Sequence, residues 1–341
     1  MDPVIPETMT AALLTAHGGP ECLEVRHDVA VPTPGPGEVL VRVLAAGVNN
    51  TDVNTRVGWY SGGGWTGSFT FPRIQGIDLC GRVVGVGAGV GPQRIGERVL
   101  VEPCWREPGA ALATARFLGS EVDGAFAQYC VVPERHAHSV ESTLDDVHLA
   151  AVPCSCSTAE NMLHRAGLEA GETVLVTGAS GGVGSAAVSL AVARGARVVA
   201  VAGVEKHDSL RALGTAAVID RHADPVGEFG PHSVDVVVDV VGGSGFAGLL
   251  DVLRPGGRYA VAGAIGGPEV TLDLRTVYLN DQRLLGCTVL DDGVFARLVG
   301  RIEDGEVTPI VSATYPLDRI HEAQADFLSK RHVGKLVLTI P

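Results

Sequence analysis

A glycine-rich stretch between an apolar run and a helical pattern constrains the fold of this chain more than any other segment. Residues 173–177 read Thr-Val-Leu-Val-Thr, as expected of a parallel strand covered on both faces. Residues 178–184 follow as Gly-Ala-Ser-Gly-Gly-Val-Gly, and a helical pattern over 185–194 ends at Gly195. Glycines here let the backbone approach a pyrophosphate, whose charge the helix N-terminus stabilises. The stretch therefore predicts a dinucleotide-binding loop.

Further strand patterns follow this loop and alternate with helical patterns. They lie at residues 198–201, 217–219, 234–238 and 259–262. Apolar strands separated by helices are typical of a doubly wound parallel sheet of the Rossmann type. This part of the chain is therefore predicted to be an α/β cofactor domain.

The part before residue 150 has a different pattern. Strand-like runs at 39–44, 82–86 and 98–101 alternate with Gly/Pro turns, which predicts a mostly β, barrel-like domain. The tail carries a helical pattern over 317–328 and a final strand over 335–338, and we expect it to return to this domain. The predicted domains are 1–154 with 295–341 and, between them, 155–294.

Composition and charge exclude several classes of partner. The net charge is −13, so the surface repels phosphate backbones and nucleic acid is not expected as a partner. No run approaches the ~18 apolar residues of a membrane span, and the first residues lack the pattern of a signal peptide. The seven cysteines form no CxxC pair. We therefore expect reduced thiols in a cytoplasmic protein.

The end of the second strand of the cofactor domain distinguishes NADPH from NADH. NAD sites usually place an acid there, which repels a 2′-phosphate, whereas this chain has Ala202. Lys206 follows at a distance suited to a phosphate, and Arg221 could add a second cation. Glu205 is the counter-evidence, and its side chain is expected to point away. These residues predict NADPH as the cofactor.

With these motifs, the chain resembles the medium-chain dehydrogenase/reductase superfamily, and within it the zinc-free quinone oxidoreductase branch, which is zeta-crystallin-like. The resemblance covers nearly the whole chain. Its landmarks are Pro36-Gly37-Glu38-Val39, Ala46-Gly47-Val48-Asn49, Gly76-Ile77-Asp78-Leu79-Cys80-Gly81, Gly96-Glu97-Arg98-Val99, Gly124-Ala125-Phe126-Ala127-Gln128-Tyr129, the 178–184 loop and Gly334-Lys335.

The resemblance implies a GroES-like barrel as the catalytic domain and assigns roles to individual residues. The cofactor-binding residues that it implies, together with those argued above, are Asn49, Thr158, Ser180, Gly181, Gly182, Val183, Ala202, Lys206, Arg221, Gly242, Gly263, Ala264, Ile265 and Lys335. Asn49 and Thr158 would flank the nicotinamide, and Tyr60 would lie in the substrate pocket. The candidate proton donor is Tyr60, or a water ordered by Asn49 or Thr51.

The departures from the superfamily's zinc-dependent members concern the metal site. Those members hold zinc with a Cys, a His and a further Cys or acid at the positions of Asn49, Ile77 and Cys154. Three protein ligands are needed for catalytic zinc, so no metal is expected here.

Without zinc, hydride delivery to an electron-poor carbon is easier than alcohol oxidation, because the latter needs the metal to stabilise an alkoxide. The predicted reaction is reduction of a quinone or an α,β-unsaturated carbonyl by NADPH. A low-turnover NADPH-binding protein, a zinc-free alcohol dehydrogenase-like enzyme and a methyltransferase stay open as alternatives. A homodimer is also expected, because an apolar strand over 284–289 would lie at the edge of the cofactor sheet.

Overall fold

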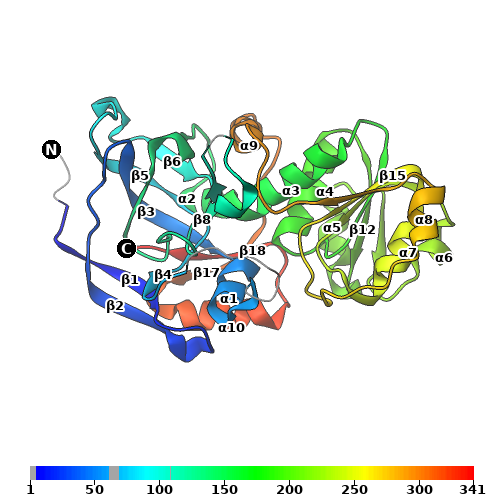
Figure 1. The fold of residues 1–341 in the computed structure, drawn as a ribbon, viewed down its shortest axis with the longest axis horizontal. Coiled ribbons are helices and arrows are strands. Elements are labelled where there is room, and N and C mark those ends of the chain that lie inside the picture. The colour runs from blue at the N-terminus through cyan, green and yellow to red at the C-terminus, as the bar shows by residue number, and fades with distance from the viewer. Residues whose placement is uncertain (1–4, 61–68, 108) are drawn as a thin grey trace. The chain divides into compact units, whose positions relative to one another are not determined.

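The computed structural model describes residues 5–60, 69–107 and 109–341, and the chain forms two compact units (Figure 1). The first unit comprises Met1–Cys154, Phe295–Gly305 and Pro309–Pro341, and the second comprises Ser155–Val294 and Glu306–Thr308. Among the helices of the described residues, none has the length and apolar character that crossing a membrane requires.

The first unit is built mainly of strands. Its strands are β1 (Thr8–Leu14), β2 (Leu23–Ala30), β3 (Glu38–Val48), β4 (Arg73–Ile74), β5 (Cys80–Val86), β6 (Arg98–Val101), β7 (Cys104–Trp105), β8 (Arg116–Phe117), β9 (Tyr129–Pro133), β10 (Ala137–Ser139), β17 (Val311–Pro316) and β18 (Lys335–Thr339). The largest sheet has the order β10-β6-β5-β3-β18-β17, with β9 also paired to β3, and a second sheet has the order β2-β1-β4. The mostly β architecture predicted for this part of the chain is confirmed.

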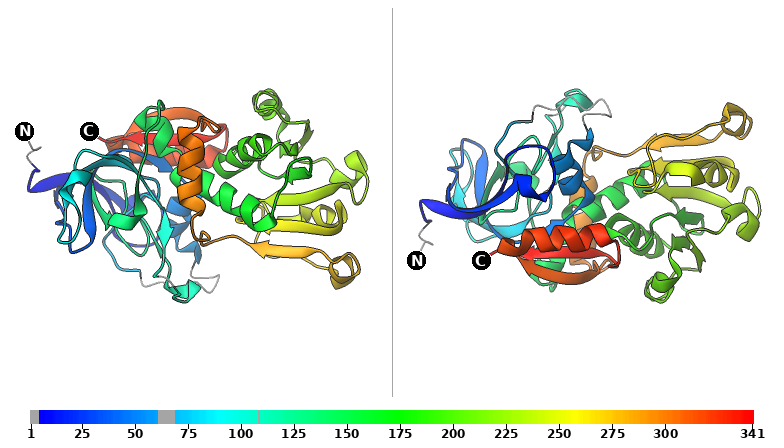
Figure 2. Two further views of the ribbon diagram at one scale, coloured as in Figure 1. Left: turned by 90° about the horizontal axis from the view of Figure 1, so that it is seen from above. Right: turned by 90° about the horizontal axis from the view of Figure 1, so that it is seen from below.

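Strand β3 is central to this sheet, because it pairs with β5, β9 and β18. Val39, Val41 and Val43 point into the core of the unit and are fully buried. The tail joins the same sheet, since β18 pairs with β3 in antiparallel fashion and Leu336 lies opposite Val48. The helices of this unit are α1 (Asn50–Val57), α2 (Asp146–Ala150), α9 (Val294–Glu303) and α10 (Ile320–Ser329). Figure 2 shows α10 lying along β17 and β18, against which it packs.

The second unit is a parallel sheet with helical connections. Its elements are α3 (Pro153–Ala166), β11 (Thr173–Val176), α4 (Gly182–Ala193), β12 (Arg197–Ala202), α5 (His207–Arg211), β13 (Ala217–Asp220), α6 (Pro225–Phe229), β14 (Val234–Asp239), α7 (Phe246–Asp251), β15 (Leu253–Val261), α8 (Leu274–Leu279) and β16 (Arg283–Gly286). The strand order is β13-β12-β11-β14-β15-β16, and all five pairings are parallel. The predicted Rossmann-type doubly wound sheet is confirmed, and β16 is one of its edges.

One helix begins earlier than the sequence pattern predicts. The apolar period favours a start at Ser185, but α4 begins at Gly182 with Gly181 as its N-cap. Glycine has a low helix propensity, so the glycines at 182 and 184 hide the first helical turn from a pattern based on side chains. The predicted end is close to the observed one, with Gly195 at a φ of 75°.

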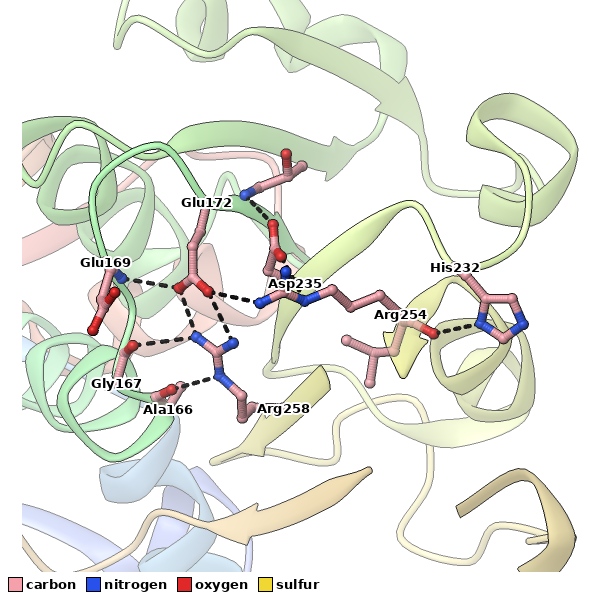
Figure 3. A network of polar contacts seen from close by, with 10 residues as sticks. Ala166, Gly167, Glu169, Glu172, His232, Asp235, Arg254 and Arg258 are labelled. Atoms are coloured by element: carbon pink, nitrogen blue, oxygen red, sulfur yellow. Dashed lines mark hydrogen bonds and ion pairs between the residues drawn. The ribbon is translucent and has the colours of Figure 1, made fainter. Parts of the chain in front are cut away.

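An ion-pair network connects the amino ends of β11, β14 and β15 (Figure 3). Arg258 donates to both carboxylate oxygens of Glu172, at 3.0 and 2.6 Å, and its Nε donates to the carbonyl of Ala166 at the end of α3. Arg254 bridges Glu172 and Asp235, at 3.1 and 2.7 Å. These contacts tie α3 to three strands at one end of the sheet. The glycine loop after β11 and the residues Ala202 and Arg221 lie at the opposite, carboxyl end of the strands.

Candidate active site

The loop after β11 is compact because its backbone folds closely on itself. Gly178 has a φ of 55°, and the Gly181 amide donates to its carbonyl at 3.0 Å. A Cβ at Gly184 would lie 2.2 Å from the Gly178 carbonyl oxygen, so no side chain fits there. A Cβ at Gly181, by contrast, would have only that carbonyl within 4 Å, at 3.5 Å. The absence of a side chain at Gly184 thus allows the loop to fold tightly, and the backbone at Gly181 has open space next to it.

The first turn of α4 lies directly behind this space. Gly181 is the N-cap of α4, and no side chain of the described residues accepts a hydrogen bond from the helix there. The N–H groups of Gly182, Val183 and Gly184 belong to the first turn of the helix. Such amides, with the helix dipole, favour an anion at this point. The loop therefore fits a pyrophosphate, which the open side of Gly181 would admit. Ser180, Gly181, Gly182 and Val183, which the sequence predicts to bind the pyrophosphate, form the end of this loop and the start of α4.

A buried aspartate rigidifies the next loop along the sheet. Asp239, the last residue of β14, is fully buried and accepts a hydrogen bond from Thr177 Oγ1 at 2.5 Å. It also accepts from the Tyr259 hydroxyl and from the amides of Val241 and Gly242, at 2.8 and 3.1 Å. Burial and the Asp239 charge raise the pKa of Tyr259, so its phenol stays protonated. The carboxylate therefore joins the ends of β11, β14 and β15.

The predicted cofactor-lining loops meet at this aspartate. A Cβ at Gly242 would lie 3.4 Å from the Cα of Ala264, and one at Gly263 would lie 2.8 Å from the Val240 carbonyl oxygen. Ile265 is 60% exposed, and Thr158 is half-buried on α3. Sequence reasoning missed Asp239. The signal was an acid directly after a buried strand and shortly before a glycine pair.

Two cations lie at the ends of β12 and β13. Ala202 is the last residue of β12, and its carbonyl accepts the Arg221 amide at 3.0 Å. Lys206 is 8% exposed, and burial lowers the pKa of its ammonium, with Glu205 raising and Arg221 lowering it. Ala202, Lys206 and Arg221 are thus brought together. The Glu205 carboxylate folds back to Gly203, where a Cβ would lie 2.6 Å from each carboxylate oxygen, and that it points away from the phosphate site stays a prediction.

The first unit holds a buried cluster of polar side chains around Asp78. Lys335 Nζ donates to Asp78 Oδ2 at 2.7 Å and to Asn49 Oδ1 at 2.5 Å, while Asn49 Nδ2 donates to Asp78 Oδ2 at 2.8 Å. The Cys154 amide donates to the other carboxylate oxygen at 2.5 Å. Asp78 is fully buried and Lys335 is 3% exposed. Sequence reasoning did not predict the pairing of Lys335 with Asp78, which lies 257 residues away.

A second carboxyl group adjoins this cluster. Asp52, in the first turn of α1, accepts from the amides of Asn49 and Ile77 at 2.8 and 3.1 Å. Burial, with the charge of Asp78 acting in the same direction, raises the pKa of Asp52 to about 7. Two acids in a desolvated space cannot both ionise cheaply. Asp52 is therefore protonated over much of the neutral and acidic range.

Tyr60 lies three residues beyond the end of α1, and its side chain contacts Thr51 and Asn54 of that helix. Desolvation raises the pKa of the Tyr60 phenol, and hydrogen bonds with Thr51 and Asn54 partly offset this. The residue keeps 36% of its surface exposed. A protonated phenol with an accessible face can donate a proton.

The three positions compared with zinc ligands carry an amide, an aliphatic side chain and a thiol. Ile77 is 3% exposed and has no donor atom, and Asn49 is occupied by Asp78 and Lys335. Burial raises the pKa of the Cys154 thiol far above its usual value, with Asp78 adding to the shift. Within the described residues, no group of three or more His, Cys, Asp and Glu side chains is arranged to hold a metal ion.

Both units match known families. Residues 35–142 match the family model of the alcohol dehydrogenase GroES-like domain, and residues 182–304 match that of zinc-binding dehydrogenase. Among curated proteins, the chain is 30% identical to a quinone oxidoreductase of Lama guanicoe over 97% of this chain and 98% of that protein. It is 29% identical to a chloroplastic NADPH-dependent alkenal/one oxidoreductase of Arabidopsis thaliana, over 99% and 81%.

Solved structures agree with this assignment. A Sinorhizobium meliloti 1021 protein, described provisionally as an alcohol dehydrogenase, is 46% identical with a TM-score of 0.94, over 99% of this chain and 98% of that chain. An NAD-dependent alcohol dehydrogenase is 33% identical with a TM-score of 0.89, over 98% and 100%. The chain belongs to the medium-chain dehydrogenase/reductase superfamily. Within that superfamily it falls in the quinone oxidoreductase branch, as the motifs predict, and it is an oxidoreductase that uses a nicotinamide cofactor.

Proposed function

We propose that the chain is an NADPH-dependent reductase that transfers hydride to a quinone or an α,β-unsaturated carbonyl compound without zinc. The observation that carries the proposal is the pairing of a tight glycine loop with two cations, Lys206 and Arg221, at the carboxyl ends of β12 and β13. In open α/β sheets, ligands bind at this end of the strands.

The second unit supplies the residues that would hold the cofactor. The amides of Gly182 and Val183 would bind the pyrophosphate, and Lys206 and Arg221 would bind the 2′-phosphate. Asp239 acts through the backbone, since it fixes the amides of Val241 and Gly242 and with them the adjoining loop. NADPH, when bound, supplies the hydride. The protein supplies orientation, which is worth several powers of ten in rate.

The donor set supports a zinc-free site. Cys154 is the one thiol among the three compared positions, whereas catalytic zinc needs three protein ligands. The Lys335 ammonium is a positive charge fixed beside Asn49 by Asp78, and it disfavours a divalent cation there. Nor does Ile77 have any atom that could bind a metal.

The charge that develops on the substrate oxygen needs a proton. We assign the donor role to Tyr60, because a phenol is protonated at neutral pH and its hydroxyl is held by hydrogen bonds with Thr51 and Asn54. Thr51 and Asn49 are the alternative positions from which a water could be ordered. Reduction of an enone or quinone then needs no alkoxide stabilisation, unlike alcohol oxidation.

The experiment that tests this function is a substrate panel with purified protein. A quinone, an alkenal, an enoyl thioester and primary alcohols are each offered with NADPH or NADP⁺, and reduced nicotinamide is followed by absorbance. We expect steady NADPH consumption with the quinone or the conjugated carbonyls and none with alcohols. Tight NADPH binding with no turnover on any substrate would favour the alternative of an NADPH-binding protein without an enzymatic role.

The cofactor unit also presents a surface suited to self-association, and we propose a homodimer. Strand β16 is an edge of the sheet, and Leu284 on it is 41% exposed. On the neighbouring α8, Leu274 and Leu279 are 68% and 69% exposed. Exposed apolar groups beside an open strand edge are usually covered by another chain. A monomer mass by light scattering at micromolar concentration would contradict the dimer.

A further inference from the structure

Three arginines lie directly opposite one another on neighbouring strands of the first unit. In the antiparallel pairing of β3 with β5, Arg42 is the register partner of Arg82, and in the pairing of β5 with β6, Arg82 is the partner of Arg98. Register partners in antiparallel strands extend from the same face of a sheet, with Cβ atoms about 4.5–5.5 Å apart. The three side chains therefore form one arginine row across β3, β5 and β6, which are adjacent strands in Figure 1.

The arginine row lies on the face of the sheet that is turned away from the core. Val41, Val43 and Val83 are fully buried in the core of the unit, and they adjoin Arg42 and Arg82 in the sequence. Because successive side chains of a strand point to opposite faces, Arg42 and Arg82 point away from that core. Both arginines are exposed, so a ligand in solution can reach them.

The chain itself holds one end of the arginine row. Arg98 donates to the carbonyl oxygen of Ser142 and, at 3.1 Å, to that of Leu144, both in the segment that precedes α2. Its guanidinium also lies 3.7 Å from the carboxylate of Asp146, in the first turn of α2. Arg98 is therefore fixed in place, and its charge has a partner within the chain.

The other end of the row carries two cations that no carboxylate neutralises. Within residues 5–60, 69–107 and 109–341, no ion pair involves Arg42 or Arg82. Arg82 Nη1 donates to the carbonyl oxygen of Gly96 at 3.1 Å, which leaves the charge of the guanidinium unneutralised. Like charges directly opposite each other on paired strands destabilise a sheet. An anion bound between the two guanidinium groups would remove this repulsion.

We propose that Arg42 and Arg82 form a binding site for a phosphate group on the outer face of this sheet. Guanidinium groups suit such anions, because each presents parallel N–H donors to two oxygen atoms. Two guanidinium groups on adjacent strands can share one tetrahedral anion, and Arg98 adds a third positive charge beside Arg82. The net charge of −13 repels phosphate from the surface as a whole, so binding depends on this local row. The site belongs to the first unit and is independent of the proposed reaction.

The test is calorimetric titration of the full chain with inorganic phosphate and with glycerol 3-phosphate, at constant ionic strength. NADPH is present in excess, so that the predicted cofactor site is filled. Loss of the charge-assisted hydrogen bonds of one guanidinium should weaken binding about tenfold or more in Arg42→Gln and in Arg82→Gln. Arg82→Lys keeps the charge without the paired donors, so it should weaken binding less than Arg82→Gln. Tighter binding of glycerol 3-phosphate than of phosphate would identify the ligand as a phosphate ester, and equal binding would identify it as the free anion.

A matched variant and a stability measurement control for general effects. Arg116 is also an exposed arginine on a strand of the first unit, but its register partner is Trp105. Arg116→Gln should therefore leave the affinity for phosphate within about twofold of wild type. In chloride alone, Arg82→Gln should resist urea at least as well as wild type, because the substitution removes a repulsion between like charges. Its loss of binding would then not result from unfolding.

Three results would overturn the inference. The first is that wild type binds neither anion, or that Arg42→Gln and Arg82→Gln bind both as wild type does. The second is that Arg116→Gln loses as much affinity as they do, because the attraction would then be general. The third is that Lys206→Ala abolishes binding while Arg82→Gln keeps it, because the anion would then occupy the predicted cofactor site.

Discussion

Replacing Lys335 by methionine tests whether charge holds the buried cluster around Asp78. Methionine has a similar length and no charge, so the fully buried carboxylate would keep only the uncharged donors of Asn49 and Cys154. Breaking a buried ion pair by removing one partner costs about 3–5 kcal/mol. We expect the free energy of unfolding of the first unit to fall by that amount. All three tryptophans lie within Met1–Cys154, so tryptophan fluorescence during urea denaturation reports on this unit.

Two further variants separate charge from general disruption. Lys330→Met removes an exposed ammonium that lies 2.9 Å from Asn50 Oδ1, and it should cost less than about 1 kcal/mol. In Lys335→Met/Asp78→Asn the buried charge is gone as well, so the double variant should regain about 1–3 kcal/mol relative to Lys335→Met. In one contradicting result, Lys335→Met lowers the free energy of unfolding no more than Lys330→Met does, and in the other the double variant is no more stable than Lys335→Met. Either result would show that the ion pair does not stabilise the cluster.

Four further outcomes are expected. Lys206→Ala should weaken NADPH binding about 10- to 100-fold and leave NADH nearly unchanged in fluorescence titrations, and equal losses would show a structural role. Because folding raises the pKa of Asp52 from 3.8 to about 7, its contribution to stability is full below pH ~4 and is lost as the pH rises through 7. The free energy of unfolding, measured by urea denaturation at several pH values from about 4 to 8, should depend less on pH in Asp52→Asn than in wild type. Gln324 is 2% exposed, and neither polar atom of its amide has a hydrogen-bond partner among the described residues. Gln324→Met should therefore raise the free energy of unfolding by about 1–3 kcal/mol in urea denaturation, and a decrease would refute this. Tyr60→Phe should lower turnover about 10²- to 10⁴-fold with little change in NADPH affinity, whereas a decrease under about threefold would assign proton donation to water.

The sequence predicts the sheet of the second unit because parallel strands are buried on both faces. The runs around Val174, Val199 and Val237 are therefore continuously apolar and separated by helical periods. The glycine loop is predictable for a related reason, since close backbone approach at Gly184 excludes every side chain. The local sequence pattern and local steric limits were sufficient to predict the sheet and the glycine loop.

Interactions between distant segments were not predictable in the same way. The partner of Lys335 is Asp78, which precedes β5 and is brought near by the pairing of both β18 and β5 with β3. The orientation of Glu205 depends on a folded turn at Gly203, and no periodicity reports where a flexible side chain lies. Asp239 combines both difficulties, because its partners Thr177 and Tyr259 come from two other strand ends.

The most direct test of the central claim measures zinc content and reaction together. Purified protein is assayed with NADPH and a quinone or alkenal in the presence of a chelator, and its zinc is determined by elemental analysis. Since Ile77 and Asn49 offer no metal-binding site and Lys335 places a positive charge beside it, we predict undiminished reduction and far less than one zinc per chain. Stoichiometric zinc, together with oxidation of simple alcohols by NADP⁺ that the chelator abolishes, would contradict the proposed function.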